Sequence, residues 1–346
     1  MSSSRSRPRS AKTLTTLTTL ATLAAVTTLA DPQTLSIPCV ARGSSTRRRS
    51  HAGQINSTLK MLWYDMSDMS FPTSPYLYVS PNYQSVAKAS GHTAFTLAFV
   101  TGYSNNEAVW DGGLAPDPAW CADPSKHITI SFGGAGSNTN ELAGMMKDAT
   151  ALADAYVHIA KTYHAAALDF DVEGGSVNDR AAIDRRNAAL VLVQQKLPNI
   201  KVSYTLSVMP RGLDPTGVAI LKSAKAHGVR VDCVCVMAMD YGCHTKDMGA
   251  AAIAATQATY AQLHTVGYES ARVGIIPMIG VNDTVPETFT LKDAATVKAF
   301  ASKSPWVGTL GFWSLNRDNG SRADPKPSDG HSGVVQTPFA FLRAFL

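Results

Sequence analysis

Three acidic residues alternate with apolar residues between Ala167 and Gly175. If this segment forms a strand, Asp169, Asp171 and Glu173 point to one face, because successive side chains of a strand alternate between its two faces. Neighbouring acids are then about 6.6 Å apart at Cα, at roughly 3.3 Å of rise per residue. Like charges this close on a buried strand raise one another's pKa and favour a shared proton. A carboxylic acid that stays protonated near neutral pH in this way can act as a general acid.

Two other interpretations of the same acids can be weighed. A solvated edge strand could have an acidic face, but the three alanines at 165–167 are small and apolar, which favours a buried strand. The spacing also matches the first half of an EF-hand calcium loop, which has a bidentate Glu at its twelfth position. Arg180 occupies that position here, so the sequence argues against calcium of this type.

The elements that must position the acids alternate along the chain from about residue 76 onward. Short runs of β-branched and aromatic residues, typical of strands, are separated by longer segments with helical periodicity. The predicted strands are 76–81, 93–100, 128–132, 166–171, 201–208, 232–239, 273–278 and 309–314. The predicted helices include 140–163, 178–197, 215–227, 250–266 and 291–303.

This alternation predicts the α/β class, and the eight strands predict a (β/α)8 TIM barrel over residues 74–346. A doubly wound open sheet is the alternative fold. Neither G-x-G-x-x-G nor G-x-x-x-x-G-K-[ST] follows a predicted strand, so the barrel is favoured. Barrel active sites lie at the C-terminal ends of the strands, and Glu173 falls at such an end.

The N-terminal 73 residues differ in composition from this predicted domain. The chain carries a net charge of +5, yet residues 1–50 hold eight Lys/Arg and one acid, while the rest holds 23 basic and 25 acidic residues. The predicted domain therefore has no charge that favours nucleic acid. A basic stretch, a Leu/Ala/Thr stretch and small residues at 28 and 30 predict a signal peptide over 1–30 and a secreted protein. An organelle transit peptide or a disordered tail are the alternatives, and residues 31–73 are expected to be a linker or lead-in.

Other partners and cofactors find little support in the sequence. The sequence has no uninterrupted run of 18 apolar residues, so we expect no membrane-spanning helix. The five cysteines and nine histidines show no metal-ligand spacing, so no metal or organic cofactor is expected. Cys233 and Cys235 are expected to be buried thiols on one face of a strand. We expect the protein to act as a monomer.

Motifs on four of the predicted strands together resemble those of glycoside hydrolase family 18, the chitinases and their relatives. The family signature D-x-x-D-x-D-x-E matches Asp169, Asp171 and Glu173 at its last three acids, while Ala166 replaces its first Asp. Residues 131–134 resemble the S-x-G-G motif, 237–241 resemble M-x-Y-D, and 311–313 place a Trp where the family has its sugar-stacking floor. The resemblance is to the bacterial and archaeal-type branch, which carries L-D-F-D-x-E-G, M-x-M-D-Y-G and F-W-S-L-N-R-D.

The resemblance implies a chitinase that hydrolyses β-1,4-linked N-acetylglucosamine polymers with retention of configuration. In this family the 2-acetamido group of the sugar acts as the nucleophile, so no second carboxylate is needed for that step. Glu173 would protonate the glycosidic oxygen, and Asp171 would orient and stabilise the acetamido group. Asp169 would hold or share the proton. Chitin or N-acetylglucosamine oligomers are the implied partners.

The resemblance also implies further contacts with substrate. Asp240 would contact the acetamido or hydroxyl groups of the same sugar, and Trp313 would be the platform beneath it. Met239 occupies the position of the family's usual Tyr, whose hydroxyl binds the acetamido carbonyl. Tyr241 either replaces that Tyr after a local kink or is a core residue. The residues of the S-x-G-G motif are expected to pack beneath Asp169 rather than touch sugar.

Three alternative functions are compatible with the same barrel. An endo-β-N-acetylglucosaminidase acting on glycoprotein glycans would share the acidic strand and differ in its loops. A catalytically silent chitin-binding lectin and a non-sugar-binding interaction protein belong to other function classes. Loss of the terminal Glu is the simplest sign of a silent member, and Glu173 is present.

Overall fold

The computed structural model describes residues 72–102, 107–137 and 140–346. Within these ranges, eight strands follow one another in chain order and pair in parallel. They are β1 (Tyr76–Tyr78), β2 (Ala94–Gly102), β4 (His127–Gly133), β5 (Ala167–Asp171), β6 (Lys201–Met209), β8 (Cys233–Met237), β9 (Arg272–Ile276) and β12 (Val307–Leu310). Each predicted strand overlaps one of these.

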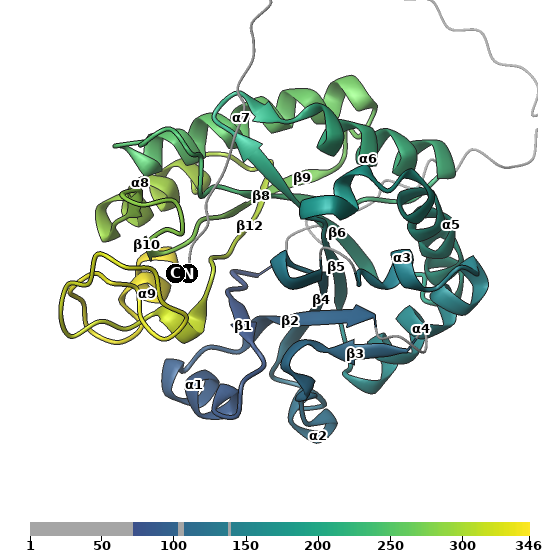
Figure 1. Cartoon of the computed structure of the whole chain (residues 1–346), viewed down its shortest axis with the longest axis horizontal. Coiled ribbons are helices and arrows are strands. Elements are labelled where there is room, and N and C mark those ends of the chain that lie inside the picture. The colour runs from purple at the N-terminus through teal and green to yellow at the C-terminus, as the bar shows by residue number, and fades with distance from the viewer. Residues whose placement is uncertain (1–71, 103–106, 138–139) are drawn as a thin grey trace, which may run out of the picture. The chain divides into compact units, whose positions relative to one another are not determined.

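Backbone hydrogen bonds join the first and last strands, so the sheet closes on itself. Ser74 N donates to Leu310 O at 2.9 Å, and Tyr76 N donates to Phe312 O at 3.0 Å. Figure 1 shows the helices arranged around the outside of the strands. The predicted (β/α)8 TIM barrel is therefore confirmed.

Helices connect most of the strands and cover the outer face of the sheet (Figure 1). They are α1 (Tyr83–Ser90), α2 (Pro118–Cys121), α3 (Leu142–Met145), α4 (Ala149–Thr162), α5 (Arg180–Lys196), α6 (Pro215–His227), α7 (Met248–Val266), α8 (Leu291–Ala301) and α9 (Ala340–Phe345). The prediction of one helix over 140–163 is wrong. The backbone becomes extended at Met146, and the Asp148 side chain caps a new helix by accepting from Ala151 N.

Short elements extend the C-terminal ends of several strands. β3 (Ala108–Trp110) pairs antiparallel with β2, and β7 (Gly212–Leu213) pairs with β6. β10 (Gly280–Val281) and β11 (Thr288–Phe289) form a hairpin after β9. Single 3₁₀ turns cover 111–113, 135–137, 174–178 and 315–317.

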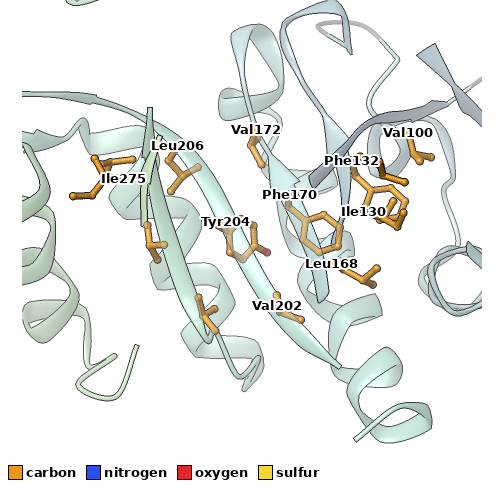
Figure 2. Packing of buried hydrophobic residues seen from close by; sticks show 14 of the residues in the cluster. Val100, Ile130, Phe132, Leu168, Phe170, Val172, Val202, Tyr204, Leu206 and Ile275 are labelled. Atoms are coloured by element: carbon orange, nitrogen blue, oxygen red, sulfur yellow. The ribbon is translucent and has the colours of Figure 1, made fainter. Parts of the chain in front are cut away.

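Apolar side chains on the outer face of the strands pack against the helices. Leu168 and Phe170 of β5 are fully buried there. The Phe170 ring stacks on Phe132 of β4 with 5.3 Å between ring centroids, and the edge of Tyr156 from α4 lies 5.2 Å away. Figure 2 shows Leu168, Phe170 and Phe132 side by side on these strands. Because side chains alternate along a strand, this packing turns Asp169 and Asp171 into the barrel.

A second, smaller hydrophobic cluster lies on the inner side of the strands. It contains Cys233 and Cys235 of β8, whose Sγ atoms are 3.9 Å apart and buried, as predicted. The register of the sheet aligns Cys233 with Ser203, which itself aligns with Asp169. Within the described ranges the cysteines are free thiols.

Several predictions fall on residues that the structure does not describe. The signal peptide over 1–30 and nearly all of the linker over 31–73 lie outside the described residues. None of the described helices is long and apolar enough to cross a membrane.

Candidate active site

The three predicted acids lie together at the C-terminal end of β5. Asp169 and Asp171 belong to the strand and are 2% and 4% exposed, and the half-buried Glu173 follows two residues later in extended backbone. The sheet register places Ser131 of β4 and Ser203 of β6 directly beside Asp169. The acids therefore lie at the end of the barrel where such folds have their active sites.

Four hydroxyl groups surround the buried carboxyl group of Asp169. Ser131 and Ser203 donate to it at 2.7 Å, and Tyr76 and Thr205 donate at 2.9 Å. Hydroxyl donors stabilise the charged carboxylate, whereas burial favours the neutral acid. Burial is the larger effect and raises the pKa of Asp169 above its usual value.

The hydroxyl network around Asp169 has room for one additional proton. Besides the four bonds to the carboxyl group, the hydroxyls of Tyr76 and Thr205 lie 2.9 Å from each other. Four hydroxyl protons cannot serve five hydrogen bonds. A proton on Asp169 completes the set, because the acid can then donate one of them. Asp169 is thus built to hold a proton inside the barrel.

Asp171 carries a buried oxygen atom with an unused capacity to accept a hydrogen bond. Its Oδ1 has no hydrogen-bond partner among the described residues. Burial raises the pKa of Asp171 well above its usual value, and the negative charges of Glu173 and Asp169 raise it further. A hydrogen bond with Glu173 adds to the increase, so Asp171 carries the proton that the pair shares.

Glu173 is the outermost acid of the row. Burial raises the pKa of its carboxyl group, the hydrogen bond from Asp171 lowers it, and the negative charge of Asp240 raises it. Glu173 therefore accepts a hydrogen bond from Asp171 and can also take up the proton itself.

Two glycines fix the end of β4 against these acids. Gly133 has φ +108°, and a Cβ there would lie 2.0 Å from the backbone oxygen of Asp171. Gly134 donates its N–H to the same oxygen at 3.0 Å, and a Cβ there would lie 2.6 Å from the ring of Phe99. Glycine is required at both positions because no other residue fits this conformation and this space. The pair positions Asp171 and Phe99 together.

A cavity of about 250 Å³, here called the inner cavity, lies beside Asp171 and Glu173. Its other lining residues are Tyr76, Phe99, Ala135, Thr205, Met237, Met239, Asp240, Ile276, Met278, Asp283, Trp313 and Asp329. The inner cavity thus brings together five of the predicted site residues: Asp171, Glu173, Met239, Asp240 and Trp313. Asp169 lies behind them.

The indole of Trp313 is held in place by other aromatic rings. It stacks on Phe99 with 5.5 Å between ring centroids and 16° between the planes. Tyr76 and Tyr78 approach its edge, with centroids 5.9 and 6.4 Å away. A fixed indole of this kind suits the apolar face of a sugar ring.

The hairpin of β10 and β11 holds Asp240 at the inner cavity. Thr284 N donates to Asp240 Oδ1 at 2.7 Å, and Asp240 N donates to Asn282 Oδ1 at 3.3 Å. Asp240 has φ +50°, in the left-handed region that non-glycine residues rarely adopt. Burial raises the pKa of its carboxyl group.

Tyr241 does not line the inner cavity and lies in the main hydrophobic core, 4% exposed. Its N–H donates to the buried carboxylate of Glu287 at 2.8 Å, and Glu287 also accepts from the N–H groups of Cys243 and Thr245. Burial raises the pKa of the Tyr241 hydroxyl. Of the two expectations for this residue, its position matches that of a core residue.

Four residues that build the site are not among those predicted from the sequence: Tyr76, Phe99, Thr205 and Glu287. Tyr76 and Thr205 lie on predicted strands, and their inward positions could have been found by extending the alternation of β5 to its neighbours. Phe99 lies in the short apolar run 97–100, which shows no alternation. Glu287 acts on Tyr241 across 46 positions of the chain, which local patterns do not detect.

Known proteins are similar to this chain over most of the described residues. No protein-family model matches the chain. The chain is 34% identical over 294 residues to "Probable bifunctional chitinase/lysozyme" of Escherichia coli strain K12, a match that covers 77% of this chain and 32% of that protein. It is 35% identical over 266 residues to "Endochitinase 11" of Metarhizium anisopliae, covering 69% and 50%. The chain therefore spans about a third and half of the length of these two relatives.

Solved structures match it over nearly their whole length. Active domain 2 of a thermostable chitinase from Pyrococcus furiosus, in catalytic-site mutants complexed with chito-oligosaccharides, has a TM-score of 0.70 and 31% identity, and the match covers 80% of this chain and 93% of that chain. The chain belongs to the chitinases of glycoside hydrolase family 18. The resemblance predicted from its motifs is confirmed. The four motifs that carry the family 18 resemblance lie at the C-terminal ends of four strands, β4, β5, β8 and β12.

The tight contact of Gly133 with Asp171 predicts a large effect of a single methyl group. Gly133→Ala is expected to lower the free energy of unfolding by about 3 kcal/mol, because it combines a strained φ with an overlap against backbone. Urea unfolding measures this change. Gly144→Ala in α3 is the control, since nothing lies within 4 Å of its Cβ, and we expect a change within about 1 kcal/mol. Equal stability of both variants would contradict this packing of β4.

The raised pKa of Asp171 predicts a pH-dependent gain in stability when its charge is removed. A carboxyl group with a raised pKa in the folded state stabilises the fold at low pH, and this contribution is lost as the pH rises through the folded-state pKa. Asp171→Asn is therefore expected to unfold at higher urea than the original protein near pH 7, by about 1 kcal/mol or more, with a smaller difference near pH 4.

Asp123 supplies a control of opposite sign for this measurement. Hydrogen bonds from Lys126 and Ser125 lower the pKa of its carboxyl group. Asp123→Asn should therefore lose stability relative to the original protein as the pH rises. A difference for Asp171→Asn that does not change with pH would contradict the pKa shift.

Proposed function

We propose that this chain is a secreted, monomeric chitinase that hydrolyses β-1,4 bonds between N-acetylglucosamine units, with Glu173 as the general acid and base. Support comes from relatives named as chitinases and from a similar solved domain that binds chito-oligosaccharides. The observation that carries the proposal is the arrangement of Asp171 and Glu173, two proton-sharing acids on one wall of a cavity that also contains an indole.

The first step of the proposed reaction is protonation of the leaving group. Glu173 donates its proton to the glycosidic oxygen as the bond to the anomeric carbon breaks. The proton must first move to Glu173, because the pair holds it on Asp171. An acetamido N–H that donates to Asp171 Oδ1 favours the charged form of Asp171 and so releases the proton to Glu173. Substrate binding thus places the proton on Glu173, from which it can be donated.

The second step is attack by the substrate itself. The carbonyl oxygen of the 2-acetamido group bonds to the anomeric carbon as the leaving sugar departs, which forms a positively charged ring. The carboxylate of Asp171 accepts a hydrogen bond from the acetamido N–H and stabilises this charge. Asp169 keeps its own proton within the network of hydroxyl groups. Glu173 then removes a proton from water, and the water oxygen bonds to the anomeric carbon as the bond between that carbon and the acetamido oxygen breaks, which restores the acetamido group. Two inversions at that carbon give overall retention.

The remaining lining residues provide the fit for an acetylated sugar. Trp313 forms the platform for the ring, and Asp240 accepts hydrogen bonds from the sugar's hydroxyl or amide groups. Met237, Met239 and Ile276 form an apolar part of the wall that suits the acetamido methyl group. Met239 has no hydroxyl group to donate, so in this chain the acetamido N–H bond to Asp171 is the main polar anchor.

The role of Glu173 predicts the effect of removing its proton. Glu173→Gln preserves the shape of the side chain, so turnover of soluble chitin oligomers should fall by about 10² to 10⁴, while oligomer affinity changes less than about threefold. Oligomer hydrolysis with product identification, together with calorimetric binding, measures both. Glu269→Gln, at an exposed carboxyl group, is the control and should keep full turnover.

Retention of more than about a tenth of the turnover in Glu173→Gln would contradict the assignment of the acid. A wild-type chain that binds chitin oligomers without cutting them would instead identify a lectin. Cleavage of glycoprotein glycans in preference to chitin oligomers would identify an endo-β-N-acetylglucosaminidase.

The role of the acetamido group predicts strict dependence on it. Cellohexaose has the same β-1,4 geometry as the chitin hexamer but a hydroxyl group in place of each acetamido group. Without the internal nucleophile, we expect its hydrolysis to be slower by at least about 10⁴, since a positioned intramolecular group contributes effective molarities of that order or more. Comparable rates for the two hexamers would contradict substrate assistance.

A further inference from the structure

A second and larger cavity, here called the outer cavity, adjoins the inner one along the indole of Trp313. It has a volume of about 620 Å³, compared with about 250 Å³ for the inner cavity. The two cavities share the lining residues Phe99, Ala135, Trp313 and Asp329. A chain of sugars that occupies the inner cavity can therefore continue into the outer one along the same indole.

The charged groups that line the outer cavity are acidic. Among its described lining residues these are Asp111 and Asp329, accompanied by the polar side chains of Tyr78, Asn316 and Asn319. Asp111 accepts a hydrogen bond from the hydroxyl of Tyr78 at 3.1 Å and from Gly112 N at 3.0 Å. Both carboxylates can accept further hydrogen bonds, because each has about four acceptor sites.

The chain around Asp329 is anchored on both sides. The carbonyl oxygen of Ser328 accepts from the guanidinium of Arg317, which is 1% exposed, and the carbonyl oxygen of Gly330 accepts from Asn319 Nδ2 at 2.9 Å. The exposed carboxylate of Asp329 itself has no hydrogen-bond partner among the described residues. The loop thus holds an available carboxylate at the junction of the two cavities.

Charges from other elements also face Asp329. Arg317 lies beneath it, and that guanidinium also interacts with Asp240 and Asp283 at the inner cavity. Tyr78 of β1 also interacts electrostatically with Asp329. One buried cation is therefore shared among three carboxylates, and Asp111 adds a fourth acid on the outer side. The charged residues that line the two cavities are acidic, which favours a cationic ligand.

We propose that the outer cavity binds a glucosamine unit through its protonated amino group, which lies between Asp329 and Asp111 against Trp313. An ammonium group gains from both carboxylates and from the face of an indole, whereas a neutral acetamido group gains no charge interaction. The inner cavity requires an acetylated unit for the reaction proposed above. Partially deacetylated chitin, with an acetylated unit beside a deacetylated one, is then a preferred substrate. This inference rests on the proposed function.

Binding of a fully deacetylated tetramer tests the site without relying on turnover. Calorimetry on the full chain, at mildly acidic pH and low salt, measures the affinity for the glucosamine tetramer and for the N-acetylglucosamine tetramer. Asp329→Asn and Asp111→Asn keep the size of the side chains and remove the charge. We expect each to weaken glucosamine tetramer binding by about threefold to fivefold and to change acetylated tetramer binding by less than about twofold.

A matched variant and added salt distinguish direct binding of the amino group by Asp329 and Asp111 from attraction by the overall charge of the protein. Asp324 belongs to the same loop as Asp329, but its side chain lines neither cavity. We expect Asp324→Asn to leave both tetramer affinities unchanged. In about 1 M salt, where charges are screened within about 3 Å, the original protein should lose the affinity that the two variants lose. Unchanged glucosamine affinity in both variants, or an equal loss in Asp324→Asn, would overturn the proposal.

Hydrolysis distinguishes failure of this inference from failure of the proposed function. Cleavage of acetylated oligomers by the original protein tests the proposed function alone. On partially deacetylated chitin, the original protein should yield products with an acetylated unit at the new reducing end and an enriched glucosamine unit beside it. Asp329→Asn should reduce that enrichment while acetylated oligomers are still cut. Products without enrichment from an active enzyme would overturn the inference and leave the chitinase proposal in place.

Discussion

The site depends on one buried carboxyl group and the four hydroxyls that surround it. The hydrogen bonds of Asp169 come from Tyr76 on β1, Ser131 on β4, and Ser203 and Thr205 on β6. A slip of β4 by one residue would turn Ser131 outward, and a slip of β6 would turn Ser203 and Thr205 outward. A buried carboxyl group that loses its hydrogen-bond partners costs about 1–3 kcal/mol, so Asp169 also favours this register of β4 and β6.

The buried acids along β5 lower the stability of the fold near neutral pH, because burial of their carboxyl groups disfavours the charged form. Asp169, Asp171 and Glu173 all have raised pKa values, with burial as the main cause, and neighbouring negative charge adds to the increase at Asp171 and Glu173. A sequence selected for stability alone would not place carboxyl groups at such positions. The hydrogen bond between Asp171 and Glu173 instead lets these two acids share one proton, while Asp169 is hydrogen-bonded to hydroxyl groups.

Sequence patterns were sufficient for the barrel and for the acids because both depend on local alternation. Each predicted strand overlaps an observed one, and the inward face of β5 follows directly from its sequence. The break between α3 and α4 was missed because apolar spacing continues through Met146, whose backbone is nevertheless extended. Contacts between distant segments, such as Glu287 with Tyr241 or Arg317 with Ser328, leave no local pattern. The role of Tyr241 could not be decided from sequence, because a tyrosine fits a core and a cavity wall equally well.

The adjacent glycines at 133 and 134 connect parts of the site that have different tasks. One touches the backbone of Asp171, and the other touches Phe99, on which Trp313 rests. The position of the acid and the position of the aromatic wall are therefore set by the same turn of the chain. During divergence, a substitution that shifts this turn must therefore move the acid and the aromatic wall together. Changes in the cavity lining that leave Asp171 in place are thereby directed to other segments, such as the residues that follow β12.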